Sequence, residues 1–411
     1  MATQTAARAL NPVDVSANAL YVDDTWRAPF AQLRAEAPVS WRADSPFGGY
    51  WSVTTHALVQ AVEVNPEVYS SRWDLGNITI ADAVGGSEFP NFIAQDAPIH
   101  TAQRKVIAPA FSPSQIVKLE AQVRARTAEL FAELPRGETF DWVDRVALPL
   151  TMGMLCILFD FPMAEWRDLK RWSDYASNVS AENLNEEYRA EFLAQMGQML
   201  ARFDRELEAR RGLPPSDDLL SRMVHSEAMG NMDVMERIAN IALLIVAGND
   251  TTRNSMSALV EAFDRYPGEL ERLRADPALI PNAAQEIIRW QSPVTHMRRT
   301  ALTATELGGQ PIAAGDKVVL WYISANRDEA VFEDAERFDV SRANARRHLG
   351  FGHGVHRCVG ARLAEVQLAA VIEQIAGLHA AVVPQGPPSR LASPFLHGFT
   401  AMPVQIAPTP G

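Results

Sequence analysis

The segment FGHGVHRCVG, residues 351–360, places a cysteine and two histidines among three glycines. Its Cys358 is one of only 2 cysteines in a chain of 411 residues. The other, Cys156, lies in the apolar run LTMGMLCILFDF, where a cysteine is typically a small buried hydrophobic residue. Cys358 is therefore the cysteine whose surroundings indicate chemistry.

Two kinds of metal site use these residue types. Zinc takes nitrogen and sulfur ligands, which His348, His353, His356 and Cys358 could provide, although the usual pair of closely spaced cysteines is missing. A haem iron needs only one thiolate, and glycines would let the loop lie against the flat porphyrin with backbone N–H groups pointing at the sulfur. A Gly-rich turn with an inert cysteine is the third interpretation.

A second unusual run, AGNDTT at residues 247–252, interrupts an apolar helical pattern with weak helix formers. The surrounding segment 233–267 predicts one helix, capped by an aspartate and ended by a proline, of roughly 50 Å at 1.5 Å per residue. Gly248 would let a flat group approach the backbone, while Asp250 and Thr251 supply an acid and an alcohol at mid-helix. Two shorter helices joined within the run are the alternative, although the flanking apolar periods are compatible with one helix.

The remaining elements are predicted to be mainly helical. Segments 114–134 and 191–211 carry apolar residues at spacings of three and four, which predicts helices that pack one face on a core. Segments 37–44, 48–62 and 315–326 cluster Val, Trp and Tyr, which predicts small sheets. Because no repeat, low-complexity tract or linker divides the chain, we expect one domain, residues 1–411.

The composition narrows the function classes. Hydrophobic residues make up 47% and charged residues 21%, so the chain can bury a large core. The formal net charge of -12 argues against nucleic-acid binding, which needs a basic face. The sequence contains no apolar run of about 18 residues and its start lacks the pattern of a signal peptide. We therefore expect a cytoplasmic protein without a membrane span.

Taken together, these motifs resemble the cytochrome P-450 superfamily of haem-thiolate monooxygenases. The family's haem-binding signature is matched by Phe351, Gly354, His356, Cys358 and Gly360. AGNDTT resembles the oxygen-binding groove of the family's long central helix, EIIR at 286–289 its Glu-x-x-Arg motif, and HTAQR at 100–104 its His-x-x-x-Arg segment. The resemblance covers essentially the whole chain. It implies the cytochrome P-450 fold, mainly α with small β-sheets, with a long central helix that crosses the molecule over a buried haem.

The resemblance also implies a role for each matching residue. Cys358 would be the proximal ligand of the iron of haem b, where its electron donation favours cleavage of the O–O bond. Thr251 would hydrogen-bond dioxygen, and Asp250 would help to relay protons to it. Glu286 and Arg289 would form a structural ion pair, with Arg337 or Arg342 as a third partner. The residues that would contact the haem are His100, Arg104, Ala247, Gly248, Arg298, Phe351, Gly352, His356, Cys358 and Gly360, and among them His100, Arg104, Arg298 and His356 would face its propionates.

A closer resemblance is to the bacterial terminal alkane hydroxylases of that superfamily, through phrases such as GNDTTRNSM, EIIRWQSPVTHMRRTA and ARRHLGFGHGVHRCVG. It implies terminal hydroxylation of medium-chain alkanes or fatty acids by a monomer that receives electrons from NAD(P)H through a ferredoxin reductase and a ferredoxin. The chain departs from that pattern at Ala247, Gly350, His353 and HGFTAMP. A hydroxylase of cyclic terpenes or other compact hydrophobes therefore stays open as an alternative, as does a non-catalytic haem sensor.

Two sets of residues would contact the substrate and the electron donor. The candidate substrate contacts are all apolar, which predicts an apolar substrate: Ile80, Val84, Phe89, Leu243, Leu244, Ala247, Val294, Met297, Phe395 and Leu396. A local basic patch could bind an acidic ferredoxin despite the acidic total. Its candidate members are Arg72, Arg104, Lys105, Arg346 and Arg347.

Overall fold

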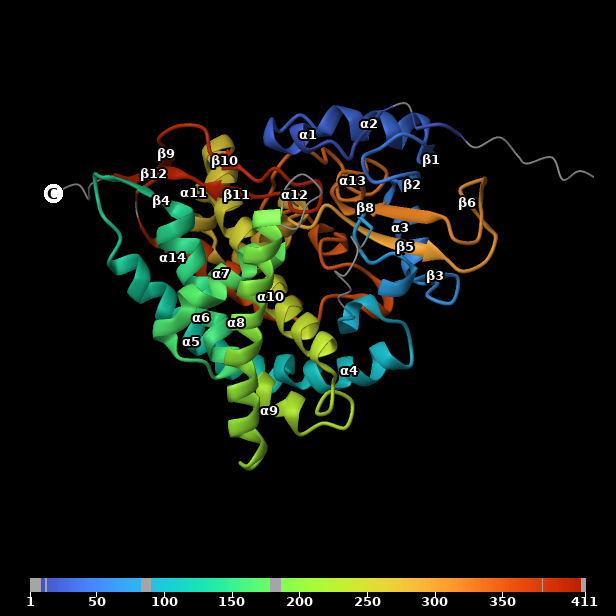
Figure 1. Cartoon of the computed structure of the whole chain (residues 1–411). Helices are drawn as coiled ribbons and strands as arrows, with labels where there is room; N and C mark the ends of the chain where they lie inside the picture. Colours follow the sequence, from blue (N-terminus) through green and yellow to red (C-terminus); the bar gives the residue numbers. More distant parts are fainter. Residues whose placement is uncertain (1–8, 12, 83–89, 178–185, 379, 408–411) are drawn as a thin grey trace, which may run out of the picture.

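The structure is a computed structural model that describes residues 9–11, 13–82, 90–177, 186–378 and 380–407 (Figure 1). Its helices are α1 (Asn18–Val22), α2 (Arg27–Glu36), α3 (His56–Glu63), α4 (Ile99–Ile107), α5 (Pro113–Ala132), α6 (Leu148–Phe159), α7 (Trp166–Ser177), α8 (Glu186–Arg211), α9 (Leu219–Val224), α10 (Val234–Arg265), α11 (Pro267–Ala275), α12 (Ile280–Gln291), α13 (Tyr322–Ala325) and α14 (Ala361–Gly377). Its strands are β1 (Val39–Arg42), β2 (Tyr50–Val53), β3 (Tyr69–Ser70), β4 (Thr139–Asp141), β5 (His296–Ala301), β6 (Thr305–Leu307), β7 (Gln310–Ile312), β8 (Lys317–Trp321), β9 (Val382–Pro384), β10 (Ser389–Arg390), β11 (Phe399–Ala401) and β12 (Pro403–Ile406). The predicted class, mainly α with small β-sheets, is confirmed.

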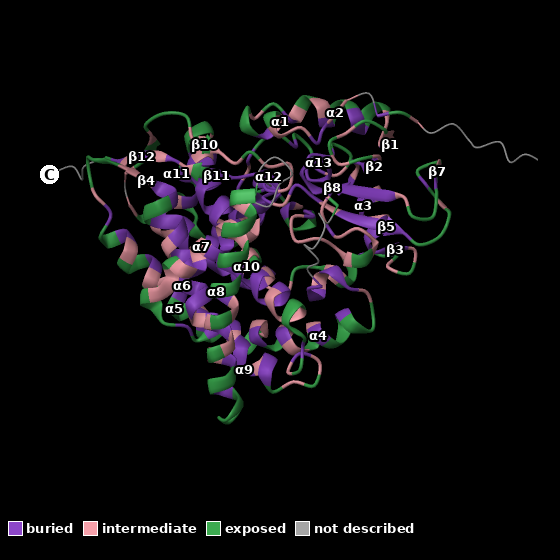
Figure 2. Cartoon of the chain, viewed as in Figure 1, coloured by how far each residue is buried: buried purple, intermediate pink, exposed green. Residues whose placement is uncertain are grey.

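The largest sheet lies at one side of the molecule and the bundle of longer helices at the other (Figure 1). Its five strands run in the order β1-β2-β8-β5-β3, with β2 and β8 parallel and the other neighbours antiparallel. All five residues of β8 are buried, as are most of β5 (Figure 2). The two strands are therefore covered on both faces, and β5 passes from the sheet to the edge of the cavity described below.

Helix α10 runs through the middle of the molecule (Figure 1). The Asp233 side chain caps it by accepting a hydrogen bond from the Glu236 N–H at 2.8 Å, and it ends at Arg265, just before Pro267 starts α11. It packs against α6, α7, α12 and α14 and contributes residues to the two largest core clusters. The prediction of one long helix is thus confirmed, and the alternative of two shorter helices is wrong.

Two local predictions differ from the structure. Only residues 39–42 and 50–53 of the early segments form strands, whereas residues 56–63 form α3, because His56, Val59 and Val62 face the core at helical spacing. The predicted apolar stripe of 191–211 is narrower than expected, since the Leu193 side chain is 68% exposed. Helix α8 faces the core through its other long apolar residues, Met196, Met199, Phe203 and Leu207.

Candidate active site

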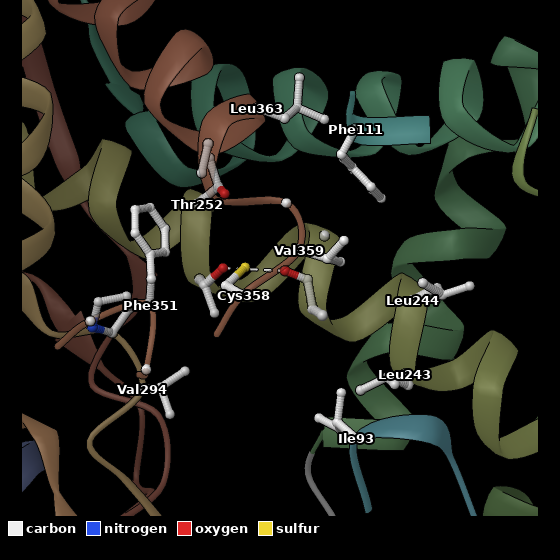
Figure 3. A pocket seen from close by; sticks show the side chains of 18 of the residues that line it. Ile93, Phe111, Leu243, Leu244, Thr252, Val294, Phe351, Cys358, Val359 and Leu363 are labelled. Carbon is white, nitrogen blue, oxygen red and sulfur yellow. Dashed lines mark hydrogen bonds between the residues drawn. The ribbon is translucent and has the colours of Figure 1, made fainter. Parts of the chain in front are cut away.

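Cys358 lies in the loop that leads into α14. Its N–H donates a hydrogen bond to the carbonyl oxygen of Phe351 at 2.8 Å, which closes the loop. The Cys358 residue is accessible to solvent, but it lies deep in the molecule, and this burial raises the pKa of its thiol. Both statements hold because the sulfur faces an internal cavity and not the outer surface (Figure 3).

The surroundings of the sulfur oppose that rise. The backbone amides of Gly360 and Ala361 and the charges of Arg104 and Arg357 all act to lower the pKa of the Cys358 thiol. Nearby N–H groups and guanidinium ions are the environment in which a thiolate is stabilised. The loop is therefore suited to present sulfur as a ligand once a cation is bound.

The glycines of the loop have a packing role that the sequence interpretation did not include. Gly352 and Gly354 have φ angles of +67° and +64°, in the region that favours glycine. A Cβ atom at Gly354 would lie 2.3 Å from the carbonyl oxygen of Glu63 at the end of α3. Gly354 is thus required for the loop to approach α3, whatever group the cavity binds.

A cavity containing about 1500 Å³ of space, some of it open to solvent, lies between the Cys358 loop and α10 (Figure 3). Its wall is largely apolar. Among the lining residues are Ile78, Phe92, Ile93, Phe111, Leu155, Leu243, Leu244, Ala247, Gly248, Thr251, Thr252, Ser255, Val294, Met297, Arg104, Arg299, Tyr322, Phe351, Gly352, His356, Cys358 and Gly360.

The predicted substrate contacts divide into three groups. Leu243, Leu244, Ala247, Val294 and Met297 line the cavity. Ile80, Phe395 and Leu396 do not line it, which corrects the prediction: Ile80 belongs to the core cluster around Trp321, Phe395 packs on the His296 ring, and Leu396 pairs with Val294 in a β-bridge. Val84 and Phe89 lie outside the described residues.

In the middle of α10, Gly248 packs closely against α6 and Thr251 presents a hydroxyl group to the cavity. A Cβ atom at Gly248 would lie 2.6 Å from Cδ2 of Leu155, so this glycine allows α10 to approach α6 as well as leaving the cavity wall open. The Thr251 hydroxyl donates to the carbonyl oxygen of Ala247 at 3.2 Å and faces the cavity. This bond uses the hydroxyl hydrogen and leaves the hydroxyl oxygen able to accept a hydrogen bond from a group in the cavity.

Asp250 is placed differently from Thr251. It is buried outside the cavity lining, where Oδ1 accepts from the Asn249 amide at 2.8 Å and pairs with Arg253 at 2.8 Å. Its Oδ2 has no hydrogen-bond partner among the described residues. Burial raises the pKa of Asp250, and the Arg253 charge opposes this rise. A buried carboxyl group beside Thr251 is compatible with a proton relay, which stays a prediction.

His100 of α4 lies against His356 of the Cys358 loop. The rings of His100 and His356 are 4.2 Å apart, and burial lowers the pKa of both, that of His100 to about 4. His100 Nε2 and His356 Nδ1 are buried without a hydrogen-bond partner in the described structure. Buried polar atoms are normally paired, so both nitrogens indicate a polar group to be bound at this edge of the cavity.

Comparison with known proteins agrees with this geometry. Residues 137–376, more than half of the chain, match the family described as Cytochrome P450. The chain belongs to the cytochrome P450 family. Linalool 8-monooxygenase from Pseudomonas putida is 36% identical over 95% of this P450 and 97% of that protein. Methyl-branched lipid omega-hydroxylase from Mycobacterium bovis is 36% identical over 93% of this P450 and 91% of that protein.

Solved structures show the same similarity. Cytochrome P450-153 from Novosphingobium aromaticivorans superposes with a TM-score of 0.91 at 48% identity, covering 96% of this chain and 99% of that chain. CYP153D17 from Sphingomonas sp. PAMC 26605 superposes with a TM-score of 0.91 at 51% identity, with the same coverage. This chain is therefore a P450 monooxygenase, an oxidoreductase of a family that uses thiolate-ligated haem b, O₂ and redox partners.

The residues of this P450 fit such a haem. Among the described residues a single cysteine faces a largely apolar cavity, and His100 and His356 each have a buried nitrogen without a hydrogen-bond partner, which the carboxylates of a haem would satisfy. Arg104 and Arg299 add two cations to the same edge of the lining. Among the described residues no group of His, Cys, Asp and Glu could hold a metal ion by itself. The zinc alternative therefore has no geometric support there.

The structure corrects one predicted haem contact. Arg298 points away from the cavity and pairs with Asp82, whereas its neighbour Arg299 lines the cavity and lies 3.6 Å from Glu63. Successive side chains of a strand face opposite sides, so Met297 and Arg299 share one face of β5. That alternation was available in the sequence, because the prediction of Met297 as a cavity residue excludes Arg298 from the same face.

The Glu-x-x-Arg pair is completed by Arg342. Arg289 binds both oxygens of Glu286, at 2.7 and 2.8 Å, and the Nε of Arg342 donates to Glu286 Oε1 at 3.0 Å. Arg337 contributes only its backbone oxygen to this network, and its side chain pairs with Glu269 at 3.4 Å. Because Arg289 also binds the backbone of residues 326 and 335, the network joins α12 to the chain that leads to the Cys358 loop.

In the part of the chain that the structure describes, no helix is long and apolar enough to cross a membrane.

Proposed function

We propose that this P450 inserts one oxygen atom from O₂ into the aliphatic C–H bond of an apolar substrate, and that its physiological reaction is terminal hydroxylation of medium-chain alkanes or fatty acids. The observation that carries this proposal is the apolar wall facing Cys358, formed by residues such as Leu243, Leu244, Val294 and Met297. Apolar walls bind a substrate by burial and hold it by shape. The resemblance to the terminal alkane hydroxylases and the similarity to a methyl-branched lipid omega-hydroxylase support the terminal position.

The distribution of charge along the wall favours alkanes over fatty acids. The arginine and histidine residues among the described lining residues are Arg104, Arg299 and His356. His356 belongs to the Cys358 loop, Arg104 donates a hydrogen bond to its Arg357 oxygen, and the Arg299 charge acts on His356. Among the described residues, the part of the wall formed by α10 and by the turn before β5 has no cation that could pair with the carboxylate of a fatty acid. Burying an unpaired carboxylate is costly, so we expect an alkane to bind at least as tightly as the fatty acid of equal length.

We further propose that a ferredoxin supplies the electrons and that residues 1–411 work as one cytoplasmic, monomeric domain. Support for one domain comes from α10, which contributes to both large core clusters. In the site, the haem supplies oxygen activation. The chain would bind the haem carboxylates through His100, His356, Arg104 and Arg299 and would exclude water with its apolar side chains, and it places the Thr251 hydroxyl at the cavity.

The test is the visible spectrum of the purified protein during titration with linear alkanes, fatty acids of the same lengths, linalool and cyclic terpenes. We expect a Soret band that shifts toward high spin with medium-length alkanes. Cys358→Ser should remove the thiolate spectrum, whereas Cys156→Ser, which changes the cysteine buried in α6, should retain it. Absence of a Soret band after expression with sufficient haem would contradict the proposal. A shift with terpenes and not with alkanes would retain the monooxygenase and discard its proposed substrate.

A further inference from the structure

The segment from Leu75 to Asp82 forms part of the cavity wall without belonging to a helix or strand over most of its length. Ile78 is buried and lines the cavity. The segment is attached to β5 by its backbone: the Arg298 N–H donates to the Ile78 oxygen at 2.7 Å, and the Thr300 hydroxyl donates to the Leu75 oxygen at 2.9 Å. Its position therefore depends on side chains and amides of the neighbouring sheet.

Two buried cations from neighbouring strands converge on Asp82. Arg298 of β5 donates to Asp82 Oδ1, and Lys317 of β8 donates to Oδ2 at 3.0 Å. The side chains of Arg298 and Lys317 are only 5% and 8% exposed, whereas that of Asp82 is 59% exposed. Buried cations are stable where a carboxylate pairs with them. Burial and the charge of Arg298 lower the pKa of Lys317, which shows how closely the two cations approach.

The same side chains hold the backbone of Ile80. Lys317 donates to the Ile80 oxygen at 3.0 Å, and the Ile80 N–H donates to His296 Nε2 at 3.1 Å. Burial lowers the pKa of His296 to about 3, so the ring is neutral and its Nε2 can accept. Both polar groups of Ile80 are thus satisfied by buried side chains of β5 and β8.

We propose that Asp82 is a positioning residue for substrate selection: by neutralising Arg298 and Lys317 it holds segment 75–82 against the sheet and sets the place of Ile78 on the cavity wall. The inference rests on the proposed function, because it takes this cavity as the substrate site. Without the carboxylate, the two cations would repel each other and turn toward water, and Lys317 would release the Ile80 oxygen. The wall at Ile78 would then loosen, and a narrow apolar chain would bind less tightly.

The test compares Asp82→Asn with Asp82→Glu and Asp74→Asn in the haem-loaded enzyme. Asp74 is the matched control, because it is an exposed carboxylate of the same loop that pairs with the exposed Arg72. We expect Asp82→Asn to accelerate hydrogen exchange of the amides in 75–82 while distant peptides stay unchanged. We also expect it to raise the dissociation constant for a linear alkane, measured by the spin shift, by about fivefold or more, in the range of typical coupling between sites. Asp82→Glu should recover much of the affinity, and Asp74→Asn should match the wild type.

Two results would overturn the inference. One is unchanged alkane affinity and unchanged local exchange in Asp82→Asn. The other is faster exchange spread over the whole protein, which would indicate a role in global stability only. Failure of the proposed function would appear separately, as a wild-type protein without an alkane-induced spin shift, and the local exchange comparison would still decide whether Asp82 holds the segment.

Discussion

At the level of single residues, the site depends on which of two adjacent arginines faces the cavity. Arg299 lines the cavity with His356, whose ring lies 4.2 Å from that of the buried His100. After burial, the charge of Arg299 contributes to the lowered pKa of both histidines. Arg298 is on the opposite face of β5 and pairs with Asp82. Both residues are arginines, so a difference in haem loss between their Gln variants would result from their different positions.

We predict that Arg299→Gln accelerates haem loss and Arg298→Gln does not. A hydrogen bond to a charged group contributes about 1.5–3 kcal/mol, so haem transfer from Arg299→Gln to apomyoglobin should be about ten- to a hundredfold faster than from the wild type. Arg298→Gln should stay within about twofold, because its side chain does not reach the lining. Equal acceleration by both substitutions would contradict the assignment.

A second prediction at this level concerns Thr251. Its hydroxyl is at the cavity and its oxygen can accept a further hydrogen bond, so Thr251→Ala should remove a group that holds a proton near bound O₂. We expect the ratio of O₂ consumed to product formed to rise about tenfold or more, while the affinity for an alkane changes little. Thr251→Ser keeps the hydroxyl and should remain close to wild-type coupling. Fully coupled turnover in Thr251→Ala would show that Thr251 has no such role.

At the level of elements, the Glu286 network joins α12 to the segment that precedes the Cys358 loop. The Glu286 and Arg289 side chains are fully buried and that of Arg342 is 7% exposed. Water therefore has little access to these three charges and could not take the place of a lost partner. The 53% exposed side chain of Arg337 is outside this pairing. Local spacing predicts the i, i+3 pair, but the choice of Arg342 as the third partner depends on how the chain folds back on α12.

We predict that Glu286→Gln lowers the free energy of unfolding by about 3–5 kcal/mol, because it leaves Arg289 and Arg342 buried without a carboxylate. The measurement is the urea midpoint followed by far-UV circular dichroism. Arg337→Gln is the control and should change stability by no more than about 0.5 kcal/mol. If Arg337→Gln were as destabilising as Arg342→Gln, the assignment of the third partner would be wrong.

At the level of the whole molecule, the electron donor must approach a chain whose net charge is -12. The predicted basic patch is smaller in the structure, because Arg72 pairs with Asp74, and Arg104 lines the cavity and donates to the Arg357 oxygen. Lys105, Arg346 and Arg347 are exposed. The Arg347 oxygen lies 2.8 Å from His56 Nε2 in α3, the helix against which the Cys358 loop packs.

We predict that replacing Arg346 and Arg347 by Gln slows reduction by ferredoxin about threefold at low salt, with the difference vanishing at high salt, since exposed charges contribute modestly and are screened. The measurement is the stopped-flow rate of reduction as a function of ionic strength. Arg265→Gln is the control. Arg265 is an exposed arginine at the end of α10, about 21 Å along the helix from Thr251, and its loss should have no effect. A salt-independent rate in the wild type would exclude electrostatic docking.

The sequence alone determined the features that depend on short stretches of chain. Cys358 with its glycines, the helix from Asp233 to Pro267 and the Glu286–Arg289 pair each follow from spacing, capping and local pairing, which act over a few residues. The family followed from the order of those motifs. The tertiary structure decided which side chains from separate elements lie together: Arg342 instead of Arg337 beside Glu286, Ile78 instead of Ile80 on the cavity wall, and Asp250 behind that wall. Those choices depend on which faces of separate elements pack together. That packing is driven by the burial of apolar surface, which is not directional and so cannot be read from the spacing of residues in one segment.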